Sequence, residues 1–197
     1  MKIPDLQPDW HDPTTLLQGT LRQRAAHRAL MSLSVFDRLR PYNPVLVGTL
    51  PIAMDIEGSD LDIICAAHDL SAFAHEVTTA YGMLDGFCSR TRDRGRDLTH
   101  VARFNHDGFP VEIFGQARPV TEQNAYIHMV VEYRLLRIGG NAAREAIRGL
   151  KRDGLKTEPA FAHYFGLPGE PYETLLAMAG LDDDALRTMV TSHLIPK

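Results

Sequence analysis

Hydrophobic residues recur along the chain at two different spacings, and the change of spacing divides the sequence into three stretches. From residue 14 to about residue 39, apolar side chains return every three or four positions, which is the spacing of amphipathic helices. Between residues 45 and 114, short apolar runs alternate with turn residues, which predicts β-strands. After Pro119 the helical spacing returns and continues to the end. We therefore expect an α+β (α/β) fold with a small mixed β-sheet flanked by helices and a helical C-terminal lobe.

Local signals mark the ends of the expected elements. Thr20 and Gln23 have the spacing of a capping box, which begins a second helix after a break near Gly19. Asp107-Gly108 has the composition of a two-residue hairpin turn. The expected strands are 45–47, 60–66, 87–92, 98–105 and 109–114, and the expected helices are 14–39, 67–81, 122–138, 142–151, 159–165, 172–179 and 183–194. We expect one domain at 1–118 and a helical extension packed on it at 119–197.

Composition and charge narrow the class of protein. With 197 residues, of which 44% are hydrophobic, the chain is long enough for one globular domain with an extension. Its net charge of −4 gives no general attraction to nucleic acid or to an anionic membrane. The sequence has no apolar run of about eighteen residues and no signal-peptide core, so we expect a cytoplasmic protein without membrane partners. Cys65 and Cys88 lie in apolar, strand-like runs, which predicts buried free thiols.

Acidic residues inside the apolar runs are the candidates for chemistry. Asp60 and Asp62 stand two positions apart on a predicted strand, and therefore on one face of it. Two like charges so close are costly unless a cation lies between them, and hard divalent cations prefer carboxylate oxygens. With Glu112 from a later strand, three carboxylates can meet around two Mg²⁺ (or Mn²⁺) ions, an arrangement used for phosphoryl displacement. Gly48 and Thr49 offer backbone N–H groups and a hydroxyl to a phosphate.

These segments together resemble the signature of the polymerase-beta-type nucleotidyltransferase superfamily. The matching residues are Val47-Gly48-Thr49, then after ten residues Asp60-Leu61-Asp62-Ile63, and later Val111-Glu112-Ile113. Ser59 fits the same pattern, whereas Thr49 and Glu112 stand where Ser and Asp are usual and keep their functional groups. Most of the chain is also similar to a small bacterial family of unassigned function with that fold, over segments 19–23, 44–51, 59–65, 111–116, 122–132 and 156–161.

The resemblance implies a reaction and a set of site residues. It implies a metal-dependent enzyme with its catalytic domain at 1–118, which transfers a nucleoside monophosphate from an NTP to a hydroxyl acceptor. The implied catalytic and metal-binding acids are Asp60, Asp62 and Glu112, and the implied nucleotide-binding residues are Gly48, Thr49, Ser59 and Lys156. The acidic charge balance favours a small molecule or a protein over a long nucleic acid as the acceptor, and RNA stays open.

Other interpretations of the same residues stay open. The acids fit capping or ion-paired surface side chains, the Gly48-Thr49 pair fits an ordinary turn, and Lys156 fits an exposed position at a helix start. His128 and Glu132 fit either a substrate-facing polar stripe or a helix-stabilising pair. A run of alternating arginines fits either an anion-binding stripe or a solvated loop: Arg90, Arg92, Arg94 and Arg96. The whole chain also fits a catalytically silent nucleotide-binding or regulatory module, or a toxin–antitoxin-type interaction protein.

Overall fold

The computed structural model describes residues 8–93 and 98–194, with side chains up to residue 190. The chain divides into two compact units. The first, which we call the sheet unit, contains the chain up to Ala53 and Asp60–Val120. The second, the helical unit, contains Met54–Ser59 and the chain from Thr121 onward. The segment Met54–Ser59 thus belongs to the helical unit, although the residues before and after it in the sequence belong to the sheet unit.

The elements follow the expected order of helix, sheet and helix. The first part of the chain forms η1 (Pro13–Gln18), α1 (Leu21–Leu33), α2 (Val35–Arg38), η2 (Arg40–Tyr42), β1 (Val45–Val47), β2 (Leu61–Ala66), α3 (Leu70–Tyr81), β3 (Cys88–Asp93), β4 (Leu98–His106) and β5 (Phe109–Gln116). The rest forms η3 (Val120–Glu122), α4 (Asn124–Arg152), α5 (Thr157–Phe165), α6 (Pro171–Met178) and α7 (Asp183–Leu194).

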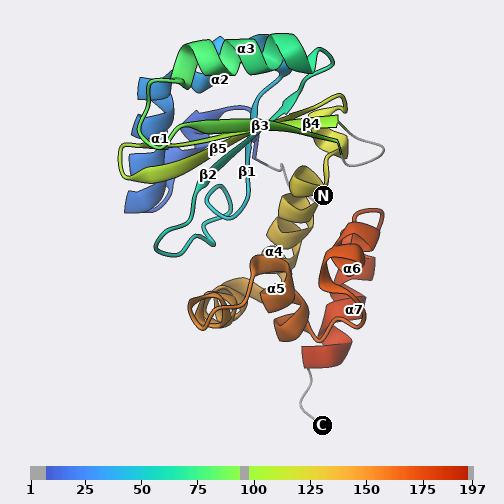
Figure 1. Cartoon of the computed structure of the whole chain (residues 1–197). Coiled ribbons are helices and arrows are strands. Elements are labelled where there is room, and N and C mark those ends of the chain that lie inside the picture. Colours follow the sequence, from blue (N-terminus) through green and yellow to red (C-terminus); the bar gives the residue numbers. More distant parts are fainter. Residues whose placement is uncertain (1–7, 94–97, 195–197) are drawn as a thin grey trace, which may run out of the picture. The chain divides into compact units, whose positions relative to one another are not determined.

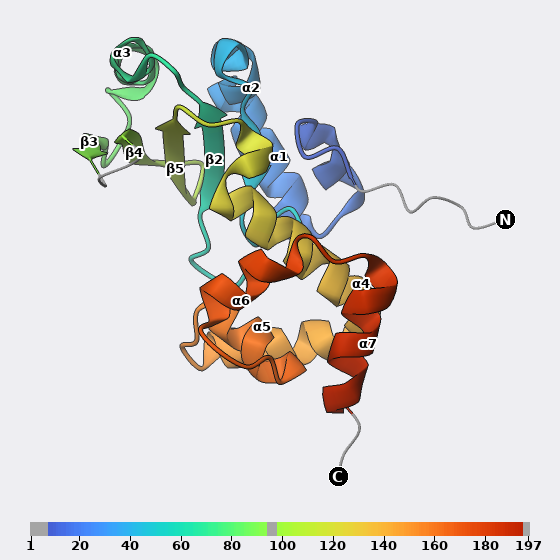
Figure 2. The ribbon, with the colours of Figure 1, turned by 90° about the vertical axis from the view of Figure 1, so that its right-hand side faces the viewer.

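The five strands form one mixed sheet in the order β1-β2-β5-β4-β3. Strands β2 and β5 are parallel, and the other neighbouring pairs are antiparallel. Helix α3 lies over this sheet in Figure 1 and is seen almost along its axis in Figure 2. Alternate strand residues, such as Leu61, Ile63 and Ile113, join the apolar side chains of α1 and α3 in one buried core. The intervening residues, Asp62 among them, lie on the opposite face, which we call the Asp62 face.

The local sequence signals at Thr20 and at Asp107-Gly108 act in the structure as expected. The Thr20 hydroxyl accepts a hydrogen bond from the Gln23 backbone N–H (3.1 Å), and the Gln23 amide oxygen accepts one from the Thr20 N–H (2.9 Å). The Asp69 carboxylate caps α3. Asp107 and Gly108 both have positive φ, of 47° and 79°, which a type I′ hairpin turn requires. Each signal is confirmed because it depends only on residues close together in the sequence.

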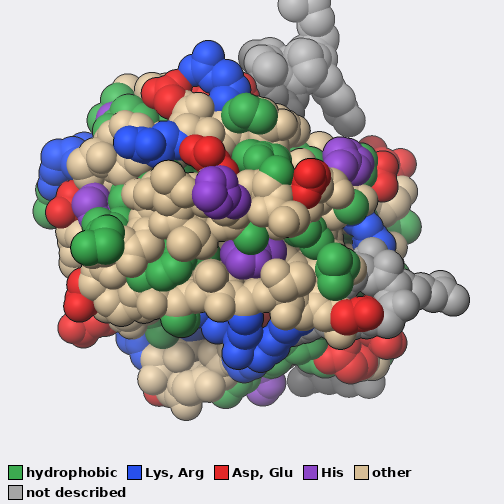
Figure 3. All heavy atoms as spheres, turned by 45° about the horizontal axis from the view of Figure 1, so that its top comes forward, with side chains coloured by type: hydrophobic (Ala, Val, Ile, Leu, Met, Phe, Trp, Pro, Cys, Tyr) green, Lys and Arg blue, Asp and Glu red, His purple; other side chains and the backbone are tan. Residues whose placement is uncertain are grey.

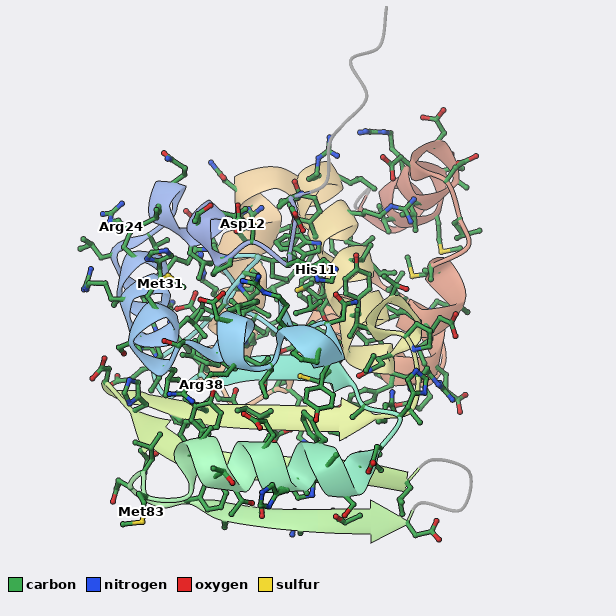
Figure 4. The ribbon with its side chains drawn as sticks, turned by 90° about the horizontal axis from the view of Figure 1, so that it is seen from above. His11, Asp12, Arg24, Met31, Arg38 and Met83 are labelled. Carbon is green, nitrogen blue, oxygen red and sulfur yellow. The ribbon has the colours of Figure 1, made fainter. Side chains whose placement is uncertain are left out.

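Helix α3 holds the sheet core through aromatic contacts. Figure 4 shows α3 lying along the strands, with Met83 in the turn beyond its C-terminal end. Tyr81 stacks on Phe104 with ring centroids 5.2 Å apart. A Cβ at Gly115 would come within 2.4 Å of the Phe73 ring, so a glycine is needed where α3 crosses β5. This close approach explains why β5 carries a glycine in the middle of an apolar run.

The helical unit has a core of its own. Its largest fully buried side chains are Phe161 and Phe165 of α5. The two helices expected at 122–138 and 142–151 form the single element α4, which contains one non-helical residue, Gly140, with φ of 62°. The sequence therefore placed the break correctly, but the chain continues in the same helical element after it.

The structure corrects one expectation about the two thiols. Cys65 is buried, but Cys88 is exposed, so the prediction of two buried thiols is wrong for Cys88. The reason is that β3 is an edge strand, all of whose residues are exposed.

Figure 3 shows charged, hydrophobic and neutral side chains interspersed over the visible face. Of the helices within residues 8–93 and 98–194, none has the length and apolar character that crossing a membrane requires.

Candidate active site

Two of the predicted acids lie side by side on neighbouring parallel strands. Asp62 of β2 and Glu112 of β5 are register partners, so their side chains project from the same face of the sheet. Asp60 precedes Asp62 by two residues, just before β2 begins, and its side chain is exposed. Asp62 and Glu112 are both half-buried. The strand pairing thus places Glu112, within the sheet unit, beside an Asp60–Asp62 pair that is far from it in the sequence.

The three acids create an excess of negative charge at Asp62. Burial, together with the charges of Asp60 and Glu112, raises the pKa of the Asp62 carboxyl to about 8, while the charge of Arg103 opposes this shift. At neutral pH this carboxyl therefore tends to keep its proton unless a cation compensates the charge. Carboxylate oxygens are also the ligands that Mg²⁺ and Mn²⁺ prefer. The charge and the donor atoms both fit a divalent cation.

Arg103 is a site residue that the sequence reasoning missed. It pairs with Glu112 in the β4–β5 register, and its Nε donates a hydrogen bond to Glu112 Oε2 (2.6 Å) while a terminal guanidinium nitrogen contacts the same oxygen. The sequence signal that could have found Arg103 is the Asp107-Gly108 turn, because a two-residue turn places residues 106 and 109 opposite each other. Counting outward along both strands then pairs Arg103 with Glu112.

The hydrogen bond to Arg103 bears on how Glu112 could bind a metal ion. Among the described residues, no three or more His, Cys, Asp or Glu side chains are arranged to hold a metal ion. Glu112 is bonded to Arg103 instead. Cation binding by Asp60, Asp62 and Glu112 together would therefore require Glu112 to share its carboxylate between the guanidinium and the metal.

Gly48 brings the backbone close to the carboxylate of Asp62. It directly follows β1, whose last residue, Val47, is the register partner of Asp62. Its φ is +80°, and a Cβ at this position would lie 2.6 Å from Asp62 Oδ2. Any other residue would be strained and would also press on the carboxylate. Thr49 follows in the turn with a half-buried side chain.

The remaining predicted nucleotide ligands belong to the helical unit. The Ser59 hydroxyl accepts a hydrogen bond from the Ile56 backbone N–H (3.0 Å), which closes the turn before Asp60. Lys156 is exposed and occupies the N-cap position of α5. Of the four alternating arginines, Arg90 and Arg92 lie on the exposed strand β3, and the other two, Arg94 and Arg96, lie outside the described residues.

The helical unit contains a buried polar cluster that the sequence only partly indicated. Lys151 is buried, and its Nζ donates a hydrogen bond to the Met54 carbonyl oxygen (2.7 Å). Burial raises the pKa of Glu132 well above its ordinary value, and the charge of Glu158 raises it further, while Lys151 opposes both. His128 Nε2 lies 3.0 Å from the Tyr172 carbonyl oxygen. Lys151 thus links the segment Met54–Ser59 to α4.

Comparison with known proteins identifies the fold. The chain resembles the Cid1 poly(U) polymerase with Mg 3'-dATP bound (14% identity, TM-score 0.51, 79% of this chain and 48% of that chain). It also resembles a Cid1 structure described for its RNA terminal uridylyl transferase activity (12% identity, TM-score 0.50, 84% and 53%). The chain spans about half the length of these proteins, and no curated protein matches it. The likeness confirms the expected α+β nucleotidyltransferase fold. A family model matches residues 28–178, and the chain belongs to that family, which is described as a domain of unknown function (DUF4269).

Proposed function

We propose that this protein is a metal-dependent nucleotidyltransferase, which transfers a nucleoside monophosphate from an NTP to a hydroxyl acceptor. One observation carries the assignment: Asp62 and Glu112 are neighbours on parallel strands, and Asp60 lies two residues before Asp62. Among the described residues, the guanidinium of Arg103 partly offsets these three acids. A fold core gains nothing from such a cluster, because uncompensated charges near the interior cost free energy. A site that binds a divalent cation with a polyanionic substrate requires it.

The residues divide the chemistry between them. Asp60 and Asp62 would hold Mg²⁺ (or Mn²⁺), and Glu112 would complete a second site; when bound, the ions neutralise phosphate charge and activate the attacking oxygen. Glu112 would help to remove the proton of the acceptor hydroxyl. The backbone N–H groups at Gly48 and the hydroxyl of Thr49 would donate hydrogen bonds to the β- and γ-phosphates. Ser59 and Lys156 stay predicted phosphate contacts.

The proposed reaction balances as an in-line displacement. The acceptor oxygen forms a bond to the α-phosphorus, the bond from that phosphorus to the bridging oxygen breaks, and pyrophosphate leaves. The protein's contribution to such a transfer is chiefly positioning and charge neutralisation. Solved neighbours with the same fold hold Mg 3'-dATP and MgGTP, which supports an NTP as the donor.

A panel of labelled ATP, GTP, CTP and UTP tests the proposal. Each is incubated with the protein and Mg²⁺, and released pyrophosphate and the thermal unfolding midpoint are measured together. We expect one or more NTPs to stabilise the protein only with Mg²⁺, and Asp62→Asn to remove both effects. Glu145→Gln, which removes an exposed carboxylate of α4, is the matched control and should keep both.

The outcomes separate the proposed enzyme from a silent module. Stabilisation by Mg²⁺ and an NTP without pyrophosphate release, even with candidate acceptors present, would indicate a nucleotide-binding protein that does not turn over. The absence of any Mg²⁺-dependent stabilisation, or stabilisation equal in Asp62→Asn, would refute a metal site at these acids.

A further inference from the structure

A cavity opens beside the acids within the sheet unit. Its volume is about 300 Å³, and its lining includes Asp60, Glu112, Gly86, Cys88 and Asn105. Arg103 also lines it. The strand register accounts for this composition, because Glu112, Arg103 and Cys88 are successive partners across β5, β4 and β3. The cavity therefore extends from the carboxylates toward the edge of the sheet along the Asp62 face.

The charge of the lining limits what the cavity can bind. Asp60 and Glu112 contribute two carboxylates, and Arg103 contributes the guanidinium already bonded to Glu112. The Asn105 amide nitrogen donates a hydrogen bond to Asp85 (2.9 Å), which adds another carboxylate close to the far end. In the metal-free protein the lining thus carries an excess of negative charge, and its guanidinium already has an anionic partner. A phosphate ester would be repelled there, whereas hydroxyl and ammonium groups would find acceptors.

We propose that this cavity binds the acceptor, and that the acceptor is an uncharged or amino-bearing hydroxyl compound about the size of one sugar ring. That the ligand of this cavity is an acceptor rests on the proposed function. A volume of about 300 Å³ lies at the lower end of small-ligand pockets, which suits a single ring rather than a polymer. A hydroxyl bound at the acidic end lies next to Glu112, the group proposed to take its proton.

Cys88 provides a direct reporter of binding. Its thiol is exposed and lines the cavity. The only other cysteine, Cys65, is fully buried, and burial raises the pKa of its thiol, so a neutral alkylating reagent should react at Cys88 alone. A ligand in the cavity should slow alkylation by the factor 1 + [L]/Kd, which is about threefold at twice the Kd.

The experiment measures, in EDTA, the rate of Cys88 alkylation by iodoacetamide with three probes: glucosamine, glucose and glucose 6-phosphate. We expect glucosamine and glucose to slow the reaction in a saturable way, glucosamine at the lower concentration, and glucose 6-phosphate to have little effect. The control is the double variant Cys88→Ser with Ser89→Cys. It moves the thiol to the next residue of the exposed strand β3, whose side chain points to the other face. Alkylation of this control should not respond to any probe.

Each other outcome overturns the inference. If neither sugar slows alkylation, the cavity does not take this class of compound. If glucose 6-phosphate protects as strongly, the charge argument is wrong. If the control thiol is protected equally, the sugars do not act in the cavity. The assay needs no nucleotide and no turnover, so protection of Cys88 without pyrophosphate release in the NTP panel would refute the proposed function while leaving the binding site in place.

Discussion

Replacing Asp62 with asparagine should stabilise the metal-free protein at high pH. Burial and the neighbouring acids raise the pKa of Asp62 from its ordinary value of 3.8 to about 8. Because the folded pKa is raised, the folded state keeps a proton that the unfolded chain has lost, and stability falls as pH rises from near 4 to near 8. Asparagine has the same shape but no proton to lose, so the variant avoids this cost.

The magnitude follows from the shift. One pKa unit corresponds to about 1.4 kcal/mol, so a shift of about four units gives an upper limit on the order of 6 kcal/mol. Asp62 is only half-buried, and water at its carboxylate reduces the cost, so we expect a measured difference of about 2–3 kcal/mol at pH 8.5. At pH 5 the difference should be small, since little of the cost has yet appeared.

Urea unfolding in EDTA, repeated across this pH range, measures the effect. The free energy of unfolding of the wild type should fall with rising pH relative to Asp62→Asn, while Glu145→Gln should run parallel to the wild type. Excess Mg²⁺ should close the gap, because a cation that binds only the folded wild type adds stability. Parallel curves for wild type and Asp62→Asn would show that the acids do not accumulate charge at Asp62, and the case for a cation site would lose its basis.

Two further substitutions test a buried polar side chain in each unit, Gln23 in the sheet unit and Lys151 in the helical unit. Gln23→Ala should lower the free energy of unfolding by about 1–3 kcal/mol. The reason is that it removes the capping box and the hydrogen bonds to the Leu50 and Pro51 carbonyl oxygens (2.9 and 3.2 Å). A decrease below about 0.5 kcal/mol in urea unfolding would contradict this prediction. Lys151→Met should lower the free energy of unfolding by about 3 kcal/mol, since it removes the hydrogen bond to the Met54 carbonyl oxygen and the positive charge that opposes the burial of Glu132. Adding Glu132→Gln should recover part of the loss. A double variant no more stable than the single one would show that the charge of Lys151 does not act on Glu132.

The elements that the sequence predicted well are those that local physics determines. The capping box at Thr20 and Gln23 and the turn at Asp107-Gly108 each depend on residues within a few positions of one another. Strand alternation is equally local, and it led to the expectation that Asp60 and Asp62 share a face; in the structure Asp60 lies just before β2, which begins at Leu61. The alternation could not show that β2 lies beside β5, because that parallel pairing joins strands separated by α3 and two further strands.

Burial was the property least accessible from the sequence. Cys88 sits in a run that resembles a buried strand, yet β3 forms the edge of the sheet and exposes every residue. Lys151 shows the opposite case. A lysine near a helix end usually reaches solvent, but here Lys151 is buried and its ammonium donates a hydrogen bond to the Met54 carbonyl oxygen. In both cases the answer depends on which distant segment covers the residue, and composition carries no such information.

The contact between Arg103 and Glu112 could have been predicted from the sequence by combining the hairpin turn with the strand register. The hairpin turn fixes the register of Arg103, and the register places its guanidinium against Glu112. That contact lets three acids share one region of the sheet, because the arginine offsets part of their repulsion in the folded protein. The same contact makes the arginine a competitor of any cation for Glu112. Under the proposed function, Arg103 would stabilise the three acids in the metal-free protein and would release Glu112 when a cation binds.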